Sequence, residues 1–79
     1  MELIKVDSSN IDKLGYENET LYVLFKNGGL YKYNSVPLFH YQEIIKAESV
    51  GKYLNKEIKK IFECVRLWDD DPEYIDIVG

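Results

Sequence analysis

The sequence contains few of the residues that cross-link or interrupt small folds. A single cysteine, Cys64, among 79 residues excludes an intramolecular disulfide, which secreted domains of this size usually contain. Only two prolines and five glycines are present, and 46% of the residues are hydrophobic, so the composition is that of a folded chain. No apolar run approaches the roughly 18 residues that span a bilayer, and residues 1–5 do not resemble a signal peptide. We therefore expect one cytoplasmic domain without a membrane partner.

The chain also lacks the side-chain combinations that mark catalytic and metal sites. His40 is the only histidine, and no cysteine, serine or carboxylate stands at a recognisable spacing from it. A structural zinc site needs more cysteines or histidines than this chain has. The acidic run 69–71 is not followed by the glycine and distal glutamate of a calcium-binding loop. We therefore expect no enzymatic activity, no cofactor and no metal.

Positive charge is not in excess, because the net charge is −4. Residues 1–62 contain nine lysines and eight acidic residues, whereas residues 63–79 contain six acidic residues and Arg66 as the only cation. We therefore divide the chain into a near-neutral domain, 1–62, and an acidic extension, 63–79, packed on or beside it. This balance does not favour general binding to nucleic acid, which depends on phosphate neutralisation, but a local basic patch could still bind one.

The apolar pattern predicts an α+β fold, with a small antiparallel sheet of about four strands and two helices packed on it. Strands are expected over residues 3–6, 11–16, 20–26 and 29–34. Asn27-Gly28 predicts a central hairpin with a type I′ turn, since that turn needs positive φ at both central residues. Helices are predicted from Ser35 to about 48 and from Ser49 onward, with an apolar stripe that reaches Val65. Residues 74–78 could form a last strand, a strap or a mobile tail.

Several strings of residues, in a fixed order, resemble the KTSC domain family. They are Ser8-Ser9-Asn10-Ile11, Gly15-Tyr16, Tyr31-Lys32-Tyr33, Val36-Pro37 and the run Ser49 to Asn55. The resemblance covers about residues 8–62. The family is named for the C-terminus of some lysyl-tRNA synthetases and also occurs as small stand-alone bacterial and phage proteins. The resemblance implies a domain of unknown function that could bind RNA. This chain departs from the usual pattern at Leu54, where phenylalanine is more common, and in its acidic extension, which could compete for a basic surface.

The start of the second predicted helix is a candidate anion site. The first amides of a helix lack internal partners, Ser49 offers a hydroxyl, Gly51 allows close approach, and Lys52 supplies charge. Ser8 and Ser9 could assist, although their first interpretation is a polar turn. The alternative interpretation is an ordinary capped helix start, with Gly51 present for packing.

Basic and aromatic residues provide two further candidate surfaces. Lys52, Lys56, Lys59 and Lys60, with Asn55 beside Lys59, could follow a phosphate backbone, or they could form an ordinary solvated helix face. Tyr31 and Tyr33 share one strand face and could stack on bases, or they could lie half-buried beneath a helix. The pairing register decides between these two positions.

These features lead to three functional hypotheses. The first is a non-enzymatic module that binds nucleic acid, RNA above all. The second is a protein that binds and sequesters a nucleotide or another phosphorylated small molecule, as a phage-type domain could. The third is a protein-interaction or self-assembling domain that could form a homo-oligomer, and residues 74–78 could add a strand to a neighbouring sheet.

Overall fold

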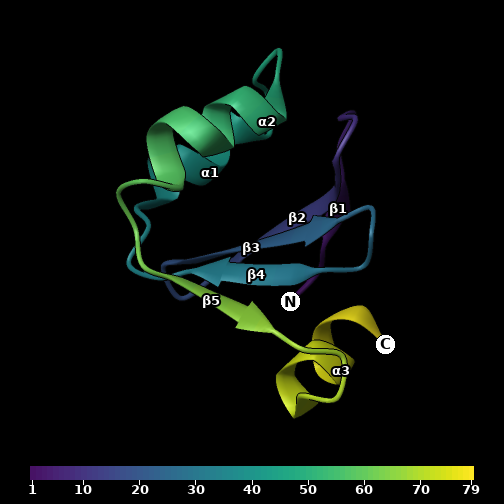
Figure 1. Ribbon diagram of the computed structural model, residues 1–79. Helices are drawn as coiled ribbons and strands as arrows, with labels where there is room; N and C mark the ends of the chain where they lie inside the picture. Colours follow the sequence, from purple (N-terminus) through teal and green to yellow (C-terminus); the bar gives the residue numbers. More distant parts are fainter.

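The computed structural model describes all residues, 1–79, and contains one five-stranded antiparallel sheet with helices on both faces (Figure 1). The strands lie in the sheet in chain order, β1 to β5. The elements are β1 (Ile4–Lys5), β2 (Ile11–Glu17), β3 (Thr20–Phe25), β4 (Leu30–Tyr33), α1 (Leu38–Ile44), α2 (Val50–Tyr53), the π-helical turn η1 (Leu54–Ile58), β5 (Cys64–Leu67) and α3 (Pro72–Val78). The predicted α+β class is confirmed, and the structure adds a fifth strand and a third helix.

The central strand β3 is buried on both faces, and each face contributes to a separate core. Leu21 and Val23 belong to the larger core, which α1, α2 and η1 cover with residues that include Ile44 and Ile58. Tyr22 and Leu24 point to the opposite face and pack with Leu30 and Leu67, next to Tyr74 and Ile77 of α3. Figure 1 shows α1 and α2 on one side of the sheet and α3 on the other. Alternating side-chain directions along one strand therefore hold two helical layers together.

The β3–β4 hairpin uses a different turn from the one the sequence predicts. The β3–β4 hairpin is confirmed, but the type I′ turn at Asn27-Gly28 is wrong, because only Gly28 has positive φ (94°). The Gly28 amide donates to the Phe25 carbonyl and the Phe25 amide to the Gly29 carbonyl, as in a three-residue loop with a glycine bulge. The pair of positive φ angles falls instead at Asn18 and Glu19, between β2 and β3.

The predicted ends of the helices also change. Ser35 is not an N-cap: it has a φ of 58°, and α1 begins after Pro37. The second helix stops before Val65, which lies in β5 and pairs with Lys32. Part of the acidic extension is therefore a strand of the sheet. Residues 74–78 lie within α3, so the last strand that the sequence allowed for this segment does not form. Every helix is too short and polar to cross a bilayer.

Candidate functional site

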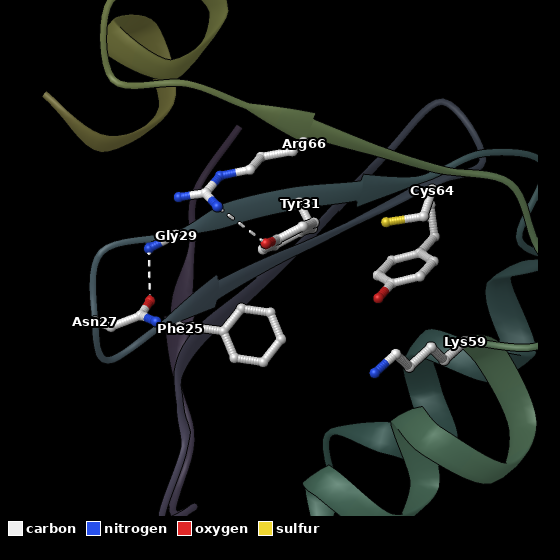
Figure 2. A pocket seen from close by; sticks show the side chains of 8 residues that line it. Phe25, Asn27, Gly29, Tyr31, Lys59, Cys64 and Arg66 are labelled. Carbon is white, nitrogen blue, oxygen red and sulfur yellow. Dashed lines mark hydrogen bonds between the residues drawn. The ribbon is translucent and has the colours of Figure 1, made fainter.

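A groove opens on the helix-facing side of the sheet, near the edge formed by β4 and β5 (Figure 2). Its volume is about 460 Å³. The lining residues are Phe25, Asn27, Gly29, Tyr31, Tyr33, Lys59, Cys64 and Arg66. The groove therefore combines aromatic rings, two cations, an amide and a thiol, and it includes three residues from the sequence-based candidates: Tyr31, Tyr33 and Lys59.

The pairing register brings these side chains onto one face. Tyr31 pairs with Val23, and Tyr33 pairs with Leu21, so both tyrosines project toward the helices. On the other side of β4, Tyr31 pairs with Arg66 and Tyr33 with Cys64. Directly paired residues of an antiparallel sheet point to the same face, so β5 supplies the outer wall of the groove.

Arg66 is held by aromatic contacts and makes no ion pair. Its guanidinium carbon lies 5.4 Å from the centre of the Tyr31 ring and 3.9 Å from the centre of the Trp68 ring. Its Nη1 donates to the Tyr31 hydroxyl at 3.3 Å, and Tyr31 meets Phe25 edge-on at 5.5 Å. Cation–π contacts orient a guanidinium without neutralising it, so Arg66 keeps its charge for a ligand.

Lys59, the residue that follows the π-helical turn η1, supplies the opposite wall. The Lys59 amide donates to the Leu54 carbonyl at 2.8 Å, five residues earlier, and in Figure 2 the Lys59 side chain reaches from this helix toward the sheet. A smaller hollow of about 220 Å³ adjoins the groove, lined in part by Asn10, Gly51, Leu54 and Asn55. Lys59 makes no ion pair, and neither hollow has a carboxylate in its lining. The site is thus positively charged although the whole chain is acidic.

Tyr33 is the most deeply buried ring of the groove. It is 3% exposed, lines both hollows, and its hydroxyl hydrogen-bonds to no protein nitrogen or oxygen. Burial, followed by the neighbouring Cys64 thiol, raises the pKa of Tyr33, so the hydroxyl remains a proton donor at neutral pH. Because Tyr33 has so small an exposed area, Tyr31 and not Tyr33 is the tyrosine ring accessible for stacking.

The residues of the predicted anion site at the helix start do not all share one hollow. The Ser49 hydroxyl accepts the Lys52 amide at 3.3 Å, so one of the free amides is already occupied. Ser49, Lys52 and Lys56 line a separate depression that also contains Glu48 and Glu57, whereas Gly51 faces the smaller hollow. The geometry is that of a capped helix start, with cations balanced by nearby carboxylates.

The remaining candidates lie outside the groove. The Ser8 hydroxyl accepts the amides of Asn10 and Ile11 and closes the turn before β2, and Ser9 is exposed beside it. Lys60 is exposed and lines neither hollow. The lysines do not form a single stripe, because the π-helical turn changes the helical phase between Lys56 and Lys59.

Lys32 and His40 both have structural partners away from the groove. Lys32 projects from the opposite face of β4 and pairs with Glu73 of α3 at 2.9 Å, so it is not a free surface lysine. Nδ1 of His40 lies 2.9 Å from the Tyr53 hydroxyl, and its ring contacts Phe39 and Phe62. Cys64 therefore has no imidazole or carboxylate beside it in the groove.

Sequence reasoning missed Phe25, Asn27, Gly29, Cys64, Arg66 and Asn10 as site residues. The hairpin register could have revealed Phe25, because a strand that pairs Val23 with Tyr31 brings Phe25 to the same face. No local signal identifies Cys64 and Arg66, since their contribution depends on β5 pairing with a strand more than thirty residues away.

Comparisons with known proteins agree on one family. The KTSC domain model matches residues 7–62. An uncharacterized protein of Stutzerimonas stutzeri is 36% identical over 73 residues, which cover 90% of this chain and all of that protein. A lysine–tRNA ligase of Trichormus variabilis is 37% identical over 67 residues, or 82% of this chain but only 12% of the ligase. The crystal structure of a KTSC domain protein from Yersinia pestis superposes with a TM-score of 0.81 at 32% identity, covering 85% of this chain and 97% of that one. The sequence motifs, the match over residues 7–62 and the shared fold show that this chain belongs to the KTSC domain family.

Proposed function

We propose that this protein is a non-enzymatic module that binds single-stranded nucleic acid, RNA in particular, in the groove between β4–β5 and η1. The observation that carries the proposal is the groove lining: Lys59 and Arg66 without ion-pair partners, aromatic rings beside them, and no carboxylate, in a chain of net charge −4. A ligand that suits this lining carries negative charge and a flat ring, and a nucleotide unit has both.

Each part of a nucleotide has a matching group. Bases stack on exposed aromatic faces without a strict sequence preference, and Tyr31 with its Arg66 neighbour offers such a face. Phosphates are attracted to Lys59 and Arg66. The Asn27 and Asn55 amides can donate and accept hydrogen bonds, as base edges and the RNA 2′-hydroxyl require. The partial match to a lysine–tRNA ligase supports RNA over DNA.

Binding without a reaction is favoured by the same lining. Nucleophilic catalysis by Cys64 would need an adjacent base, and the groove contains neither histidine nor carboxylate. We also propose that the module acts in the cytoplasm, where a solitary thiol remains reduced.

A mononucleotide is the second candidate ligand, and the size of the groove is what favours it. A volume of about 460 Å³ lies within the range of roughly 300–1,000 Å³ that is typical of small-molecule sites. A short oligonucleotide and a free nucleotide share the same contacts, so binding measurements must separate them.

The test is a fluorescence-anisotropy titration of labelled single-stranded RNA at about 50 mM and about 200 mM salt. We expect affinity to fall steeply with salt, and Lys59→Ala or Arg66→Ala to weaken binding and reduce the log–log salt slope by about one each. Lys60→Ala is the matched control, because it removes an equal charge outside the groove. Unchanged anisotropy at low salt contradicts the proposal. Stabilisation by mononucleotides without oligonucleotide binding supports the second candidate instead.

A further inference from the structure

The groove and the smaller hollow are adjacent and share part of their lining. Phe25, Tyr33 and Lys59 line both of them. Their volumes, about 460 and 220 Å³, describe one larger and one smaller compartment that meet at these three side chains. A ligand that fills only the larger compartment would leave the smaller one unused.

The two compartments offer different chemistry. The larger one has the Tyr31 ring, the Arg66 guanidinium and the buried Gly29 in its floor, where an added Cβ would lie 3.3 Å from the Tyr31 ring. This is a flat surface with a cation at its rim. The smaller one places the amides of Asn10 and Asn55 around Gly51 and Leu54. These amides suit hydrogen bonding to the edge of a base, while the larger compartment suits stacking.

The junction between the compartments holds two hydrogen-bond donors. The Lys59 ammonium has no carboxylate partner, and the Tyr33 hydroxyl has no nitrogen or oxygen partner in the protein. Because Tyr33 and Lys59 line both compartments, the Tyr33 hydroxyl and the Lys59 ammonium can both donate to an anionic oxygen of a ligand that passes between them. The group that links two nucleotides is such an anion.

We infer that the ligand is a single strand at least two nucleotides long, with one nucleotide in each compartment and the bridging phosphate on Lys59 and Tyr33. This inference rests on the proposed function and specifies its minimal ligand. It also assigns roles: Tyr31 and Arg66 hold one base, Asn10 and Asn55 contact the other, and Lys59 and Tyr33 hold the phosphate between them.

The test compares a nucleoside monophosphate with the corresponding dinucleoside monophosphate by NMR titration of the protein. We expect the dinucleotide to bind at least about tenfold more tightly, since a second base adds its own contacts. Gly51→Leu should reduce the dinucleotide affinity more than the mononucleotide affinity and so remove most of this gain. Gly51 lines the smaller compartment, and a Cβ added there meets no heavy atom within 4 Å. Because the substitution also replaces a helical glycine, the variant should fold, with the leucine side chain at that compartment.

Variants at the junction give a second measurement. Lys59→Ala and Tyr33→Phe should reduce the affinity for the dinucleotide more than that for the uncharged nucleoside, and Lys60→Ala should change neither. Equal affinity of the wild-type protein for mono- and dinucleotide overturns the inference but leaves the proposed function intact if longer strands bind with steep salt dependence. A dinucleotide gain that survives Gly51→Leu also overturns it. Failure of every nucleic-acid ligand to bind contradicts the proposed function as well.

Discussion

The Lys32 ammonium of β4 lies 2.9 Å from a carboxylate oxygen of Glu73 in α3, on the face of the sheet opposite the groove. The other oxygen of Glu73 accepts the Tyr22 hydroxyl at 2.9 Å. One carboxylate therefore joins α3 to two neighbouring strands. The hydrogen bond from Lys32, and to a lesser extent that from Tyr22, lowers the pKa of Glu73, although partial burial opposes this shift.

We predict that Glu73→Gln destabilises the fold near pH 7 by roughly 0.5–1 kcal/mol, since water still reaches the carboxylate and screens the pair. A lowered pKa means that the folded state favours the ionised form. The stabilisation is therefore present above the unfolded pKa of about 4.3 and is lost as the pH falls through the folded-state pKa. Urea unfolding at about pH 7 and about pH 3 should show the difference from wild type shrinking in acid. Glu43→Gln, which breaks an exposed pair with Lys46, should have little effect at either pH.

Ser49 provides a second prediction, which separates a structural role from ligand binding. Its side chain caps α2 by accepting the Lys52 amide, so Ser49→Ala should cost about 1 kcal/mol and lower the melting temperature by roughly 4–8 °C. RNA affinity should not change at temperatures where the variant is folded, because Ser49 does not line the groove. A large loss of affinity with an unchanged melting temperature would restore the anion site that the sequence suggested at this helix start.

Ile58 is the basis of a third prediction, about the core. It is fully buried at the end of η1, one residue before Lys59, and packs in the larger core. Ile58→Ala should cost about 2–5 kcal/mol, because it removes buried methyl groups and leaves a cavity. A domain of this size has little stability in reserve, so chemical denaturation should show a much lower midpoint or an unfolded chain. Ile61→Ala is the control: its side chain is 65% exposed and should contribute little.

The contrast between these two isoleucines shows where the sequence could predict the fold and where it could not. Alternation over residues 20–25 correctly identifies β3, because side-chain direction in a strand depends on local order alone. Ile58, Ile61 and Val65 continue a helical spacing, so the sequence predicts one helix through all three. In the structure the helix ends before Val65, which belongs to β5. Pairing of β5 with β4 outweighs the local pattern, and a long-range contact of this kind leaves no periodic signal.

Long-range pairing also determines the conformation of the turns and the arrangement of the site. Glu19 adopts a positive φ against its intrinsic preference, because Glu17 and Thr20 are fixed opposite each other by the β2–β3 ladder. Tyr31 and Lys59 were identified from residue type, but their meeting in one groove depends on strand register and on the π-helical turn. The chemical type of each candidate residue could therefore be predicted from the sequence, whereas the arrangement of the side chains around Arg66 depends on the fold.

Trp68 gives the last prediction, because it is the only tryptophan and contacts a groove residue. Its indole ring, 57% exposed, holds the Arg66 guanidinium at 3.9 Å beside Tyr31. A phosphate that engages Arg66 should disturb this contact, so short RNA should change the Trp68 fluorescence with the same midpoint as in anisotropy. Trp68→Ala should weaken binding several-fold, since cation–π contacts of this kind are worth about 0.5–1 kcal/mol. Arg66→Ala should retain the tryptophan and lose the fluorescence response, while Lys60→Ala retains both. A full response in Arg66→Ala would place the ligand elsewhere and remove β5 from the binding site.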